Sequence, residues 1–128
     1  MKKLSMLSKA AVGLSLILGG MVTASATVYT STDVPVAIPD LATVFSTLTI
    51  TDSFLITDIN VTLGELIHTF DGDLDIFLIG PDGLTIVELT SDNGGSGNNF
   101  IDTVFDDEAA TAIAGLGTTF APFTGSFR

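Results

Sequence analysis

The chain has 128 residues and a strong excess of acid, with 15 Asp and Glu residues against 4 Lys and Arg, for a formal net charge of -11. This balance argues against a nucleic-acid partner, because binding to phosphates needs clustered Lys and Arg. Three of the four basic residues lie in the first nine positions, so residues 27–128 hold all 15 acids and only Arg128 as a base. About 100 residues allow one domain with a modest core, and two independent domains are not expected.

The amino terminus has the three-part layout of a secretory signal peptide, which we predict over residues 1–26. Three lysines precede an apolar stretch from Ala10 to Val22, and Ala24-Ser25-Ala26 follows with the small residues that a signal peptidase reads, so cleavage is expected after Ala26. The apolar stretch is shorter than the ~20 residues that cross a bilayer core, which disfavours the main alternative, an uncleaved anchor. The sequence therefore predicts a secreted, extracellular or periplasmic protein that is not bound to a membrane after cleavage.

Cysteine is absent from the chain, which excludes both a disulfide and a thiolate metal site. A small exported domain gains stability from some other crosslink. A hard cation held by carboxylates is the crosslink that this acidic composition favours.

The first part of the predicted mature chain has an extended segment followed by two expected strands. Residues 27–37 are rich in Thr, Val and Ser, and Pro35 and Pro39 interrupt any regular pairing. Val44–Ile50 is a plausible first strand. Phe54–Leu63 is a clearer one, because apolar and polar residues alternate along it as in a half-buried strand.

The second part has a hairpin, a loop and a further strand. Leu74–Ile79 and Leu84–Leu89 flank Gly80-Pro81-Asp82-Gly83, which is a strong turn signal. The polar segment Ser91–Asn99 is expected to be a loop, and Phe100–Phe105 a strand.

After that strand, Asp106–Ala114 is compatible with a helical turn that has acids at its start, where the helix dipole favours them. Many short strands and no long helix predict an all-β protein, an antiparallel β-sandwich of jelly-roll type.

Three aspartates, Asp71, Asp73 and Asp75, share one side of an extended segment because they are spaced by two residues. Their charges repel unless a cation lies among them, and oxygen ligands of this kind suit Ca²⁺ or Mg²⁺. An EF-hand is excluded because its sixth position needs Gly and here is Ile76. The alternative is that the acids line a solvated edge or cap turns. A second acidic group contributes only if it meets the first in space; it comprises Asp102, Asp106, Asp107 and Glu108.

Catalysis is not predicted from these residues. His68 is the only histidine, and Ser96, the one serine in a Gly-rich loop, lacks the strand-turn-helix context of a presented nucleophile. Paired carboxylates cleave glycosides in other proteins, but the chain has no Trp and little else to form a sugar platform. We expect His68 to orient a turn through hydrogen bonds, and we expect no enzymatic activity.

Several ordered blocks of the sequence resemble the P domain, or P/Homo B domain, which follows the catalytic domain of subtilisin-like proprotein convertases and of many secreted bacterial proteases. The first block has the order His-Thr-aromatic, Gly-Asp-Leu, strand and Pro-x-Gly turn. The similarity spans residues 38–128, and its blocks are Ile67 to Gly83, Asn98-Asn99-Phe100, Thr103 to Ala109 and Ala121 to Arg128.

The resemblance implies a non-catalytic jelly-roll sandwich that packs on a subtilisin-like protease domain and supports its folding and stability. It also implies bound calcium, with His68 as a structural motif residue. The candidate calcium ligands that it carries over are Asp71, Asp73, Asp75, Asp102, Asp106 and Asp107.

The chain departs from the family pattern in two respects. The predicted leader runs directly into the P-like region, so no protease domain is expected in the chain. The family's Gly-rich stretch and Gly-x-Trp strand pair do not follow Arg128, so the sandwich is expected to lack its last strands, as a truncated product or as a fragment completed by a partner.

The expected partner is a subtilisin-like protease domain or another extracellular protein. A different class of function is also open, namely an extracellular or cell-surface structural or adhesive β-sandwich unrelated to proteolysis.

Overall fold

A computed structural model describes residues 26–128, so the predicted signal peptide lies outside the described residues except for Ala26. The all-β class is confirmed: the regular structure consists of five short strands and two single-turn 3-10 helices, and no described helix is long and apolar enough to cross a membrane. In chain order the elements are β1 (Val61–Leu66), η1 (Asp71–Asp73), β2 (Asp75–Ile79), β3 (Ile86–Ser91), β4 (Phe100–Phe105), η2 (Thr118–Phe120) and β5 (Phe123–Phe127).

The described residues divide into two compact units. One contains residues 26–35 and 46–50, and the other contains residues 36–45 and 51–128. All five strands belong to the second unit, so the sandwich and the candidate site are properties of that unit alone.

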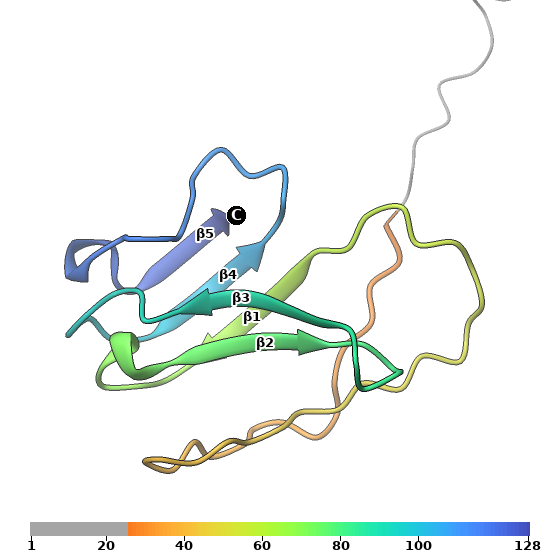
Figure 1. Ribbon diagram of the computed structural model, residues 1–128, viewed down its shortest axis with the longest axis horizontal. Coiled ribbons are helices and arrows are strands. Elements are labelled where there is room, and N and C mark those ends of the chain that lie inside the picture. The colour runs from red at the N-terminus through yellow and green to blue at the C-terminus, as the bar shows by residue number, and fades with distance from the viewer. Residues whose placement is uncertain (1–25) are drawn as a thin grey trace, which may run out of the picture. The chain divides into compact units, whose positions relative to one another are not determined.

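The second unit contains two sheets (Figure 1). One has three strands in the order β1-β4-β5, and the other is the β2–β3 hairpin. The predicted antiparallel pairing is present between β1 and β4 and within the hairpin, but it is wrong for β4 and β5, which run parallel. The long connection between these strands returns the chain to the starting end of β4, and parallel pairing requires such a crossover.

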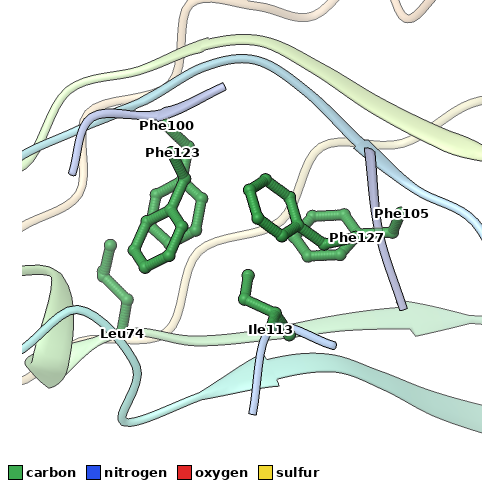
Figure 2. Close-up of a cluster of buried hydrophobic side chains, with 6 residues drawn as sticks. All are labelled: Leu74, Phe100, Phe105, Ile113, Phe123 and Phe127. Carbon is green, nitrogen blue, oxygen red and sulfur yellow. The ribbon is translucent and has the colours of Figure 1, made fainter. Parts of the chain in front are cut away.

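The core lies between the three-stranded sheet and the hairpin. Figure 2 shows four phenylalanines gathered with Leu74 and Ile113. Phe100 and Phe123 stack with their ring centroids 4.8 Å apart, and Phe127 meets Phe123 edge to face at 5.7 Å. Partly buried side chains of β1 and of both hairpin strands pack against this cluster, which gives the sandwich-like arrangement its two layers.

An irregularity in β4 decides which of its residues face the core. The pairing of β4 with β5 shifts register between Phe100 and Thr103, and Asp102 between them has a φ of 48°. This bulge changes the alternation, so Phe100, Thr103 and Phe105 are all buried while Asp102 is exposed. The Thr103 hydroxyl donates a hydrogen bond of 2.7 Å to the carbonyl of Phe123, which joins the two parallel strands inside the core.

Three local predictions were wrong. Residues 44–50 form no strand, and the carboxylate of Asp33 instead accepts hydrogen bonds from Ser46 and Thr47 at 2.6 Å. The strand predicted from Phe54 begins only at Val61, because pairing with β4 starts there. Residues 106–114 contain only short turns, the first of them closed by a bond from Ala109 N–H to the carbonyl of Asp106, and no helix.

The predicted turn between β2 and β3 is present and is organised by Asp82. Its Oδ1 accepts hydrogen bonds from the backbone N–H groups of Leu84 and Thr85 at 3.0 and 2.9 Å, and its Oδ2 accepts the Thr85 hydroxyl at 2.7 Å. The bonds from the Thr85 backbone, the Thr85 hydroxyl and the Leu84 backbone lower the pKa of Asp82 to about 2. The side chain thus favours the hairpin register in its ionised form.

We expect Asp82→Asn to lower the melting temperature by a few degrees at neutral pH. Because the folded pKa is depressed from 3.8 to about 2, the charge contributes its stability above pH 3.8 and loses it as pH falls through about 2. The difference in melting temperature between wild type and variant should therefore become smaller as pH falls from 3.8 to 2, in melts followed by circular dichroism. Thr85→Val removes one of the three donors to Asp82 and should lower the melting temperature by less. A difference between wild type and Asp82→Asn that does not change with pH would contradict the role of the charge.

Candidate functional site around Asp71

Asp71 is a buried carboxylate at the start of η1, in the motif that carries the resemblance. Its exposed fraction is 0%. Oδ1 accepts a hydrogen bond of 2.8 Å from the backbone N–H of Asn99, whereas Oδ2 is buried with no protein partner. Burial raises the pKa of Asp71, and the Asn99 N–H and the nearby His68 imidazole oppose the rise. One oxygen of a buried carboxylate is therefore left without a balancing group.

The loop that precedes β4 closes over Asp71 through main-chain bonds. The N–H of Asp71 donates to the carbonyl of Gly97 at 2.8 Å, and the N–H of Gly72 donates to the carbonyl of Gly95 at 2.9 Å. The Gly-rich sequence permits this approach because three of the four residues in these bonds, Gly72, Gly95 and Gly97, have no side chain. The 71–73 turn and the 94–97 loop are thus held together by their backbones.

Asn99 connects this turn to the rest of the unit. It has a φ of 76°, in the left-handed region that Asn tolerates better than most residues. Its Oδ1 accepts the backbone N–H of His68 at 3.0 Å, and its carbonyl accepts the N–H of Phe123 at 3.0 Å. The backbone N–H of Asn99 also donates to Asp71. Through these three hydrogen bonds, Asn99 links η1 to β5 and to the segment that follows β1.

His68 lies beside this network and bonds to its own turn. Its Nδ1 is 2.8 Å from the carbonyl oxygen of Phe70 and 3.3 Å from the backbone nitrogen of the same residue. The ring is therefore oriented by the backbone of the segment that leads into Asp71. Asn98 adds a further link, since its amide nitrogen, in the orientation that satisfies its neighbours, donates to the carbonyls of Thr69 and Gly97.

The other two aspartates of the first acidic group differ from Asp71 because both are exposed. Asp75 faces Ser91 across the hairpin, and its Oδ1 accepts the Ser91 hydroxyl at 2.5 Å. Asp73 lies at the end of η1 and contributes to the negative charge outside the turn. The even spacing of the three residues does not place them in equivalent surroundings, because η1 interrupts the extended chain.

Three of the four residues of the second acidic group, Asp106, Asp107 and Glu108, follow β4, whereas Asp102 lies within it. Asp71 bonds to Asn99, just before β4, whereas Asp106 and Asp107 follow its last residue. The six residues of β4 lie between Asn99 and Asp106, which corresponds to roughly 20 Å at about 3.3 Å per strand residue. Asp106 accepts the backbone N–H of Glu108 at 2.8 Å, and Asp102 occupies the exposed bulge. The two groups therefore do not meet around one ion.

No three acidic, histidine or cysteine side chains within residues 26–128 gather closely enough to hold a metal ion among themselves. A cation at this site would take its protein ligands from Asp71 and backbone carbonyls, and water would complete its coordination. The orphaned Oδ2 of Asp71 is the feature of the site that fits a cation, because it is a buried carboxylate oxygen to which no group in residues 26–128 donates a hydrogen bond.

No family model matches the chain, and no solved structure matches it. The site and the sequence motifs are therefore what indicate a function.

Sequence reasoning gave no role to two residues that organise the site. Asn99 is distinguished in the sequence only as part of the block Asn98-Asn99-Phe100. Asn93 is buried, donates to the Thr90 hydroxyl at 2.9 Å and accepts the Gly115 N–H at 2.7 Å, which ties the loop to the 113–117 segment. The sequence does contain one indication of the role of Asn93: the Asn-Gly pair at Asn93 and Gly94 is typical of a specific turn as well as of a loop.

Proposed function

We propose that this chain is a secreted, non-catalytic module of the P/Homo B type that supports the folding and stability of a subtilisin-like serine peptidase. One observation carries the proposal: blocks of the resemblance that are far apart in sequence converge on Asp71. His68, Asn99 and Phe123 come from three separate blocks, and each is one or two hydrogen bonds from that carboxylate. A chance similarity of short motifs gives no reason for such convergence.

The chemistry of the site favours a structural role over catalysis. Asp71 is closed off from solvent, so its carboxylate does not reach a substrate. Its bonds and those of Asn99 join strands and turns of the same unit. Such a network fixes the ends of the sheet and the Gly-rich loop, which is what a module that presents a stable surface to another domain requires.

The proposal is tested by capture on the immobilised chain from the culture medium of the source organism, followed by a fluorophosphonate probe that labels the active serine of serine peptidases. We expect one labelled subtilisin-like peptidase to be retained, and we expect the added chain to lengthen the half-life of its activity at raised temperature. Retention of the chain on cells or matrix with no labelled peptidase would instead favour the structural or adhesive role.

Calcium is the second part of the proposal, and the Asp71 turn is its site. Oδ2 of Asp71 is the buried ligand, and Asp73 and Asp75 are the nearest acids in sequence. When bound, the ion would supply the positive charge that balances the buried carboxylate. The chain's own contribution is the hydrogen bond from Asn99, which fixes the other oxygen of Asp71.

We expect EDTA to lower the melting temperature of the wild-type chain and calcium to restore it, because an ion that binds only the folded state stabilises it by mass action. At free calcium 100 times its Kd the gain is about 2.7 kcal/mol. Asp71→Asn keeps a side-chain oxygen for the Asn99 N–H but removes the charge, and it should abolish the response. Glu65→Gln removes an exposed charge on β1 and should leave the response intact; equal melting of the wild type with EDTA and with calcium would exclude the site.

A further inference from the structure

The sandwich-like unit has an apolar trough that its own core does not fill. Two cavities of about 140 and 340 Å³ share Ile59, Leu78 and Val87 as lining residues, so they adjoin each other, and together they are called the trough. It runs from the ends of β4 and β5, at Phe105 and Phe127, to the turn of the hairpin. A cavity of about 150 Å³ holds a benzene ring, so this trough has room for two or three apolar side chains.

The rim of the trough is strongly acidic. Glu88, Asp106 and Asp107 border its first cavity, and Asp82 borders the second. Arg128 is the only basic group on the rim and the only Lys or Arg in residues 26–128. Four carboxylates against one guanidinium select for an occupant that carries positive charge on either side of an apolar centre.

The charge also argues against a second copy of the chain as the occupant. Residues 27–128 carry 15 acids against one Arg, so two copies repel each other at neutral pH. The hairpin adds a reason for an extended peptide: it is a sheet of only two strands, so each has an edge that no other strand of residues 26–128 pairs. Such edges accept an added strand by main-chain hydrogen bonding.

We propose that the trough binds an extended peptide segment of a partner, with aliphatic or aromatic side chains at its centre and Lys or Arg at its flanks. The apolar side chains occupy the space around Leu78 and Val87, and the basic flanks pair with the rim. This inference does not depend on the Asp71 site or on the proposed peptidase partner, because the trough lies on other residues.

The test uses the full chain and two synthetic peptides with the same Leu-Phe-Leu centre, one flanked by two Lys on each side and the other by two Glu. Isothermal titration calorimetry should give saturable binding of the Lys-flanked peptide, weakened by added salt, and at least about tenfold weaker binding of the Glu-flanked one. Val87→Ser should weaken binding of the Lys-flanked peptide by about fivefold or more, as loss of apolar contact predicts. Val87 is 49% exposed, so the change leaves the main core intact.

Two further variants distinguish weaker peptide binding from a loss of folding. Leu84→Ser changes a side chain that is 85% exposed and lies outside the trough, and it should leave binding unchanged. Glu88→Lys, at an exposed rim position, should shift the preference toward the Glu-flanked peptide. The proposal is overturned if the Lys-flanked peptide does not bind, if both peptides bind equally, or if sedimentation shows a dimer that Val87→Ser dissociates.

Discussion

Replacing Phe123 by Ala is expected to remove about 3–5 kcal/mol from the free energy of unfolding, which is most of the stability of a small domain. The ring is fully buried, stacks on Phe100 and meets Phe127 edge to face. Its loss leaves a cavity at the centre of the core. Because the chain contains no Trp and one Tyr, urea denaturation followed by far-ultraviolet circular dichroism is the suitable measurement.

Phe120→Ala is the matched control, because it removes the same ring three residues earlier in the chain. The side chain of Phe120 is 49% exposed. We expect it to cost less than about 1 kcal/mol, since exposed rings give up little apolar burial. Similar denaturation midpoints for the two variants would mean that Phe123 is not central to the core. Packing of the Phe123 ring would then not be what holds β5 against β4.

The elements that sequence predicted well are those defined by local chemistry. The β2–β3 hairpin follows from a Pro-Asp-Gly turn between two apolar runs, and β4 was predicted with its observed bounds. The elements that it missed depend on distant partners. Residues 44–50 have a strand-like composition, but two of them bond to Asp33 instead, and the start of β1 is set by where β4 ends. The parallel orientation of β5 depends on the path of a 17-residue connection, which no short pattern encodes.

The site was predicted less completely than the fold. Asp71, Asp73 and Asp75 looked equivalent because their spacing was read as that of an extended segment. The 3-10 turn breaks that equivalence and buries Asp71 alone. The partners of Asp71 in this loop, Gly97 and Asn99, come 26 and 28 residues later, in a segment whose composition indicates only a polar loop. Whether calcium binds there is still a prediction, and so is the assignment to a P-type module.

Gly94→Ala is the second substitution expected to have a large effect, because Gly94 allows the loop to lie against Asp71. Its φ is +92°, and a Cβ at this position would lie 2.7 Å from Cβ of Asp71 and 2.8 Å from Cε2 of Phe123. Neither neighbour can move away easily, since one is fixed by Asn99 and the other by the core. Strain of about 1–2 kcal/mol from the backbone and about 1–3 kcal/mol from overpacking should combine to destabilise the fold.

Gly125→Ala separates these two contributions. Its φ is +97°, almost the same, but an added Cβ would have no atom within 4 Å. Its cost should therefore be limited to backbone strain, while Gly94→Ala should cost more by the overpacking contribution in urea denaturation. Gly94→Ala should also reduce the response to calcium, because it displaces the Asp71 carboxylate, and Gly125→Ala should not. Equal losses of stability in the two variants would mean that the loop does not press on Asp71, and the buried carboxylate would then need another explanation.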